Sequence, residues 1–153
     1  MIYKGKESMV LSDLLTKPAH SIINQLFDSR LRLDMRNPIN GDGFGVGYYT
    51  EDAEACVFKA ITPAWNNVNL NNFSRCTGLH LVFGHVRALT QGVLAEVNCH
   101  PFVYGRYMFM HNRGISSFDK IKKRLINHVE DRFFLSIQGL TDLECSFALF
   151  LDC

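Results

Sequence analysis

One group of residues able to do chemistry lies near the end of the apolar run that starts at Leu79. Arg87 ends this run, and on a two-residue period it shares a strand face with His85. A buried arginine needs a carboxylate partner, because an unpaired charge in a protein interior costs several kcal/mol. We therefore expect Arg87 to meet a carboxylate, either from the protein as a structural ion pair or from a ligand.

A second polar group, His111-Asn112-Arg113-Gly114, ends the apolar run Met108–Met110. The Asn112 amide and the backbone N–H groups of the turn are the equipment of an oxyanion hole. Asparagine and glycine are also common in ordinary turns, so this pattern alone does not decide between the two interpretations. Arg113 is a bulky cation where a second small residue would be expected.

Cys99 and His100 are a third candidate, because a thiol and an imidazole can form a catalytic pair. As neighbours in an extended segment, however, they point to opposite faces. We therefore favour a turn that is fixed by Pro101, with His100 hydrogen-bonded, over a catalytic pair.

Glycines alternate with other residues from Asn40 to Gly47, but their spacing fits neither G-x-G-x-x-G nor a Gly-Lys-Ser/Thr phosphate loop. The run instead predicts a strand that lets another backbone approach closely.

The remaining patterns predict the elements that must position these groups. Apolar intervals, caps and turn residues predict a mixture of short strands and amphipathic helices, which suits an α+β layered domain. We expect helices at 11–27 (N-capped by Ser12 and split or kinked at Pro18), 66–76 (weakly), 116–129 (with a serine N-cap) and 141–153 (with a Thr141–Glu144 capping box). We expect strands at 41–50, 55–61, 79–88 and 107–112, the first two forming a hairpin, and a strand or helix extension at 133–139.

Composition limits the class of protein. The 153 residues and 47% hydrophobic content suit one globular domain over residues 1–153. A net charge of +1 gives no field that favours nucleic acid, and no apolar run approaches the roughly 20 residues of a membrane span. The five cysteines show no metal-ligand or disulfide pattern, so we expect reduced thiols, no metal and a cytoplasmic protein.

Taken together, six motifs resemble the class II glutamine amidotransferases of the N-terminal nucleophile (Ntn) hydrolase superfamily. They are, in chain order, NGDGFGVGYY, ITPAWNN, HVRA, NCHPF, HN-x-G and TD-x-E. The similarity runs from about Ile2 to Asp152 and is greatest to the branch with fungal glutathione-degradation and bacterial γ-glutamyl hydrolase members. It implies an αββα sandwich, here expected to be partial because family domains are longer, and truncated at both ends.

The resemblance also implies a mechanism and the roles of several residues. In the family an N-terminal cysteine attacks the γ-amide carbonyl of glutamine or another γ-glutamyl compound, with its own α-amine as the base. By this resemblance Arg87 binds the substrate α-carboxylate, Asp142 receives its α-ammonium, and Asn112 donates to the oxyanion. His100 supports the pocket, and no cofactor is implied.

The chain departs from the family pattern at two places. Family chains open Met-Cys-Arg-Phe, whereas Ile2 follows Met1 here. Arg113 interrupts the family's His-Asn-Gly, so Gly114 can supply the second oxyanion donor only if the turn shifts by one residue. Losing one such donor typically raises the barrier by about 2.7–4 kcal/mol. We therefore expect this polypeptide to be inactive as a hydrolase.

A second hypothesis is a catalytically inactive relative that binds a partner subunit or a γ-glutamyl ligand through Arg87 and Asp142. A third is an unrelated structural domain. In each case the expected partners are a small molecule or a protein, without nucleic acid or membrane.

Overall fold

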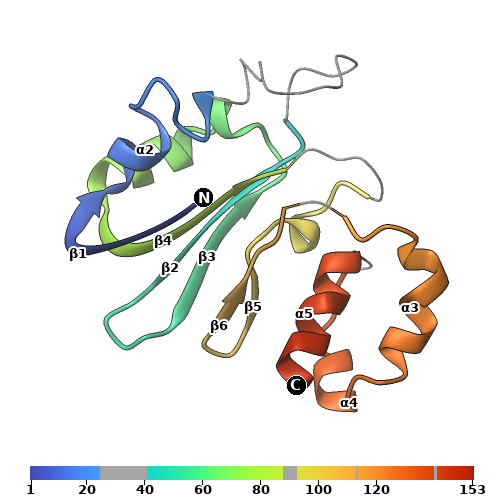
Figure 1. Ribbon diagram of the computed structural model, residues 1–153. Helices are drawn as coiled ribbons and strands as arrows, with labels where there is room; N and C mark the ends of the chain where they lie inside the picture. Colours follow the sequence, from blue (N-terminus) through green and yellow to red (C-terminus); the bar gives the residue numbers. More distant parts are fainter. Residues whose placement is uncertain (25–40, 88–92, 113, 140) are drawn as a thin grey trace.

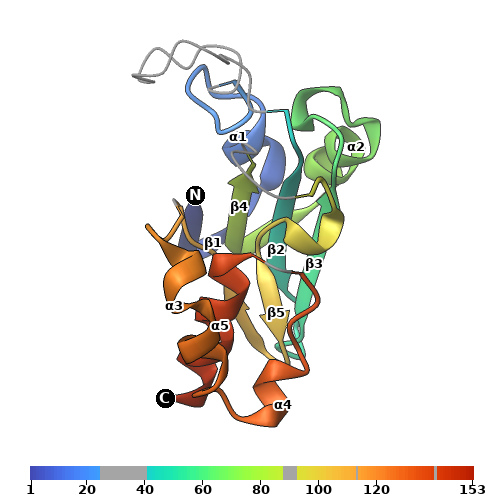
Figure 2. The same cartoon turned by 90° about the vertical axis from the view of Figure 1, so that its right-hand side faces the viewer.

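The computed structural model describes residues 1–24, 41–87, 93–112, 114–139 and 141–153. Two antiparallel sheets lie next to each other, and helices cover the outer side of each (Figures 1 and 2). The layers run helix, sheet, sheet, helix, which confirms the expected mixed α and β fold with αββα layering. Within the described ranges, no helix has the length and apolar character that crossing a membrane requires.

The larger sheet has the strand order β1-β4-β2-β3, and each neighbouring pair is antiparallel. The predicted hairpin and the long strand that ends near Arg87 are confirmed. The first strand was not predicted, because its charged residues alternate with half-buried ones along an edge and leave no apolar run. The strands are β1 (Ile2–Val10), β2 (Phe44–Tyr49), β3 (Ala55–Ala60) and β4 (Gly78–Val86).

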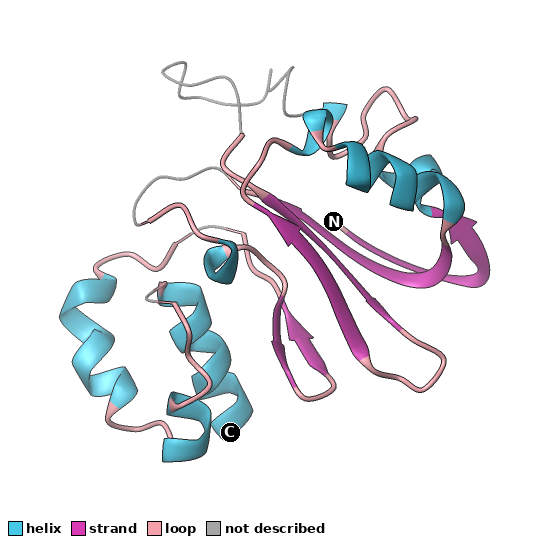
Figure 3. Cartoon of the chain, turned by 180° about the vertical axis from the view of Figure 1, so that it is seen from behind, coloured by secondary structure: helices cyan, strands magenta, loops and turns pink. Residues whose placement is uncertain are grey.

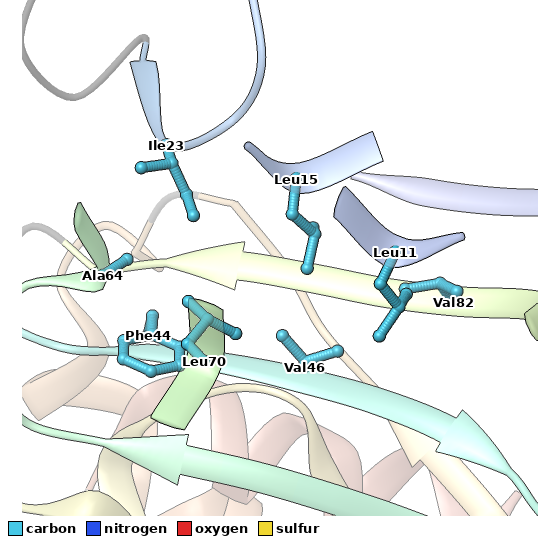
Figure 4. Packing of buried hydrophobic residues seen from close by; sticks show 8 residues of the cluster. All are labelled: Leu11, Leu15, Ile23, Phe44, Val46, Ala64, Leu70 and Val82. Atoms are coloured by element: carbon cyan, nitrogen blue, oxygen red, sulfur yellow. The ribbon is translucent and has the colours of Figure 1, made fainter. Parts of the chain in front are cut away.

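One hydrophobic core fills the space between this sheet and its helices, α1 (Leu11–Leu15), η2 (Ala64–Asn66) and α2 (Val68–Cys76). Figure 4 shows eight of its buried side chains, which come from the helices, from β2 and β4, and from the segment after α1. Asn67 caps α2 by accepting from the Leu70 amide (2.7 Å).

The helix predicted at 11–27 is confirmed only in its first part, and its predicted cap is wrong. It ends at Leu15, before the break predicted at Pro18, because proline disfavours a helical conformation at the residue before it; residues 25–27 lie outside the described residues. Val10 takes the N-cap position without a side-chain bond, since β1 leads directly into the helix, and Ser12 is buried inside it.

The smaller sheet is a hairpin of β5 (Phe102–Tyr104) and β6 (Tyr107–Phe109), packed on the glycines of β2. A Cβ added at Gly45 would overlap the His100 carbonyl oxygen, and one at Gly47 would lie 2.6 Å from Pro101 Cγ. The predicted close backbone approach along this strand is therefore confirmed, and it brings the His100 segment against the larger sheet.

The outer helices of the second layer are α3 (Phe118–Ile126), α4 (Asp131–Phe134) and α5 (Asp142–Asp152), with η3 (Glu96–Asn98) before β5 (Figure 3). Thr141 caps α5 as predicted, since its Oγ1 accepts from the Glu144 amide (3.2 Å). The serine cap predicted for α3 is wrong, because Ser117 has a φ of 56° and makes no capping bond. The strand or helix extension predicted at 133–139 is also wrong: α4 ends there as a separate short helix.

Candidate functional site

Arg87 comes directly after β4 and is held by main-chain pairing with the segment before β2. Its amide donates to the Gly43 carbonyl (2.8 Å), and its carbonyl accepts from the Asp42 amide (3.3 Å). The side chain is 8% exposed, and Nη1 donates a long hydrogen bond to the Val93 carbonyl (3.5 Å). No carboxylate of the described residues forms an ion pair with this guanidinium, so the structural ion pair is absent from that part of the chain.

Asn98 and Cys99 lie beside this guanidinium. Asn98 Nδ2 donates to the same Val93 carbonyl (3.0 Å), while its buried Oδ1 has no hydrogen-bond partner among the described residues. The Cys99 side chain is fully buried, and burial raises the pKa of its thiol despite the opposing charge of Arg87. A thiol held in its protonated form is a weak nucleophile.

His100 packs against His85 across the interface of the two sheets, with ring centroids 4.3 Å apart. Burial lowers the pKa of His85 to about 4 and that of His100 to about 3. Both rings are therefore neutral at physiological pH. Neither ring nitrogen of His100 has a hydrogen-bond partner within the described ranges, so the expectation that His100 is hydrogen-bonded in its turn is wrong there.

The first residue of the chain lies at the same end of β4. The Met1 ammonium donates to the Gly84 carbonyl (2.7 Å), and the Gly84 amide donates to the Met1 carbonyl (2.9 Å). Burial lowers the pKa of this amine, and its charge in turn lowers the pKa of His85.

Gly114 and Asp142 form a second group beyond the end of β6, and Asn112 precedes it in the same segment. Asp142 is the first residue of α5, and its Oδ2 accepts from the Ile115 amide (2.5 Å). A Cβ added at Gly114 would lie 3.2 Å from the same oxygen. Asn112 and Gly114 are exposed, and Arg113 lies outside the described residues.

The structure therefore brings together Arg87 with His100, and Gly114 with Asp142. His111 lies between the two groups, because its backbone comes close enough to the His85 ring to oppose the lowering of the His85 pKa. Asn112 follows His111 directly. Sequence reasoning missed Asn98 and the α-amine of Met1 as members of this region. The pairing of β1 with β4, which no sequence pattern indicated, is what brings the amine there.

The two groups offer side chains of opposite charge. Arg87 is a buried cation and Asp142 a half-buried carboxylate, and the neutral imidazole of His100 and the amide of Asn112 lie between them in the sequence. No cluster of histidine, cysteine, aspartate and glutamate suited to a metal ion occurs in the described ranges.

Comparisons with known proteins identify the family of this chain. Residues 12–153 match the family model described as "Glutamine amidotransferases class-II". The chain is 62% identical to the "Probable glutamine amidotransferase DUG3" of Saccharomyces cerevisiae, over 99% of this chain and 44% of that protein. It is 24% identical to the "Gamma-glutamyl-hercynylcysteine sulfoxide hydrolase" of Mycolicibacterium smegmatis, over 67% of this chain and 44% of that protein.

A solved structure shares the fold. It is a glutamine aminotransferase class-II domain protein from Silicibacter pomeroyi, matched with a TM-score of 0.68 and 24% identity over 99% of this chain and 53% of that one. The chain spans less than half the length of the two curated relatives named above. The family match over residues 12–153 and the high identity to the yeast protein show that this chain belongs to the class II glutamine amidotransferases.

Proposed function

We propose that this domain binds the γ-glutamyl group of a small amide, such as glutamine or glutathione, between Arg87 and Asp142. Arg87 pairs with the α-carboxylate, Asp142 takes the α-ammonium, and Asn112 donates to the amide oxygen. The observation that carries the proposal is the buried Arg87 without a carboxylate partner among the described residues. A planar guanidinium suits a bidentate pair with such a carboxylate. The name of the mycobacterial relative supports the γ-glutamyl class.

The register of β1 on β4 supports a place for a nucleophile at this site. Ile2 pairs with Phe83 and Met1 with Gly84, so three further residues before Met1 would pair with His85, Val86 and Arg87 in turn. The amide and carbonyl of Arg87 both form their hydrogen bonds with the segment before β2. They are therefore not available to the β1 side, and the third residue would form a non-hydrogen-bonded pair with Arg87. In such pairs the Cα atoms are about 4.5 Å apart and the side chains share a face.

The test compares the polypeptide that begins at Met1 with one that carries Cys-Arg-Phe before Met1 and loses its initiator methionine. We expect the first to bind L-glutamine in an NMR titration without releasing glutamate. We expect the second to release glutamate from glutamine or glutathione, because its cysteine lies opposite Arg87 with a free α-amine. Arg87→Met should abolish binding in both forms.

A matched control carries Cys-Phe before Met1. Its cysteine would lie opposite Val86 and would point to the other face of the sheet, toward α1 and α2. Equal hydrolysis by both extensions would contradict the register argument. Binding by all forms without hydrolysis by any would favour the alternative of an inactive binding module, and absence of binding would overturn the proposal.

The effect of Arg113 is measurable only in the form that carries the cysteine. We expect Arg113→Gly there to raise kcat by roughly 100-fold or more, because a missing backbone oxyanion donor typically costs that much. In the form that begins at Met1 the same change should restore nothing. Unchanged kcat in the cysteine form would mean that Gly114 already supplies the donor.

A further inference from the structure

A hollow of about 200 Å³ lies between β3, β5 and α5, at the open edge of the two sheets. Its apolar walls include Phe102 and Phe147, and its polar lining includes Lys59, Gln138 and Glu144. Neither Arg87, Asn112 nor Asp142 lines it, so it is distinct from the site proposed above. At about 30 Å³ per water molecule, it holds roughly six waters or one small organic molecule.

Lys59 brings a cation into this hollow. Its stem passes over Gly45, where an added Cβ would lie 3.4 Å from Lys59 Cγ, and its Nζ lies 5.6 Å from the centre of the Phe102 ring. Burial lowers the pKa of this ammonium, although nearby charges, that of Glu144 among them, oppose the lowering. No carboxylate of the described residues lies within ion-pair distance of it. A half-buried ammonium of this kind gains free energy when an anion joins it.

Glu144 also lines the hollow, but its charge is already matched. Its two oxygens accept hydrogen bonds from the Gln138 amide (2.8 Å) and the Gly139 amide (2.7 Å). It also lies in the first turn of α5, where the helix dipole favours a negative charge. Among the groups that line the hollow, Lys59 is therefore the charge without a hydrogen-bonded counter-group in the described part of the chain.

We propose that this hollow is a second binding site, which takes a small carboxylate with a short apolar body. The carboxylate pairs with Lys59 Nζ, and the apolar body lies against Phe102 and Phe147. The site does not depend on the chemistry proposed at Arg87, and a carboxylate without an amino group distinguishes the two.

The test is an amide NMR titration with pentanoate. A second titration uses 1-pentanol, which has an apolar chain of similar length but no charge. We expect saturable shifts for residues that line the hollow, Val57, Val103 and Gln138 among them, and at least tenfold weaker binding of 1-pentanol. Lys59→Met should weaken pentanoate binding at least tenfold. Lys123→Met, which removes an exposed lysine from α3, should leave it unchanged.

Two further measurements make the outcome decisive. Lys59→Arg keeps the positive charge and should retain binding, so it serves if Lys59→Met does not fold. Arg87→Met should bind pentanoate as the unaltered chain does. The proposal would be overturned by equal affinity for both probes or by shifts that do not saturate. Loss of pentanoate binding in Arg87→Met would also overturn it, and would assign the anion to the γ-glutamyl site.

Discussion

His85 and His100 contact each other across the interface of the two sheets, with their ring planes inclined at 51°. His85 lies in β4 of the larger sheet and His100 in the segment just before β5 of the smaller one, and both rings are neutral because burial lowers their pKa values to about 4 and about 3. The pair lies between Met1 and Arg87 along the end of β4. It therefore couples the packing of the sheets to the region where we propose that a ligand binds.

The first prediction concerns pH. In the unfolded chain a histidine takes up a proton near pH 6.5, whereas these two take one up only near their lowered values. The unfolded state thus binds more protons below pH 6.5, and the free energy of unfolding should fall as the pH drops from 7.5 to 5. Denaturant unfolding at several pH values measures this slope.

Two variants separate this pair from other groups. His100→Gln should flatten the slope between pH 6.5 and 5, before most carboxylates titrate. His128→Gln removes an exposed histidine after α3 and should leave the slope as it is. An unaltered slope in His100→Gln would show that the pair does not control the pH dependence.

The second prediction concerns the contact of the sheets at Gly45. Alanine there would overlap the His100 carbonyl oxygen, which belongs to the backbone and cannot rotate away. We expect Gly45→Ala to lower the free energy of unfolding by about 3 kcal/mol, at the upper end for an overpacked core. At Gly84 the added Cβ would meet only the ends of Leu15 and Met1, 3.3 and 3.4 Å away. Gly84→Ala should therefore cost less. If denaturant unfolding showed that both variants lose the same unfolding free energy, this account would be contradicted.

Much of the larger sheet was predictable, because alternating and continuous apolar runs mark β2, β3 and β4. The glycine run of β2 indicated the close approach of another backbone, although not which segment makes it. By contrast, β1 was not predictable, since its side chains are mostly exposed and its pairing with β4 joins distant parts of the sequence. The candidate site shows the same difference between residues that a local pattern reveals and residues that distant packing brings together.

Arg87 was found because an arginine at the end of an apolar run is unusual. Asn98 was missed because only the three-dimensional packing brings it beside Arg87, and Met1 because only the pairing of β1 with β4 brings it near His85. The link from Gly114 to Asp142 likewise depends on how α5 docks against the end of β6, which no local pattern reveals. Composition and periodicity thus predicted the strands that carry the site better than the contacts that assemble it.

The third prediction concerns the buried carboxylate of Glu144. Each of its oxygens accepts a backbone N–H, so Glu144→Gln would turn an NH2 donor toward one of those donors. We expect a loss of about 2 kcal/mol in unfolding free energy, typical of a buried donor left without an acceptor. Glu130→Gln, at an exposed ion pair with Arg132, should change it by less than about 1 kcal/mol. Equal effects in thermal unfolding would argue against a special role for Glu144.

The fourth prediction separates the structural part of Asp142 from its proposed ligand part. Asp142→Ala removes the acceptor of the Ile115 amide and a negative charge at the start of α5, so we expect a loss of about 2 kcal/mol and faster hydrogen exchange at Ile115. Asp152 occupies the other end of α5 and accepts only a long bond from the Glu130 amide (3.4 Å). Asp152→Ala should therefore change the free energy of unfolding little, because the hydrogen bond that it removes is long and exposed.

Asp142→Asn completes the comparison. Its amide oxygen still accepts from Ile115, so stability and exchange should stay close to those of the unaltered chain. Without the negative charge, however, the α-ammonium of glutamine loses its counter-ion, and binding should weaken at least tenfold in an NMR titration. If Asp142→Asn binds glutamine as well as the unaltered chain does, Asp142 only holds the turn at Gly114, and the ammonium must find another acceptor.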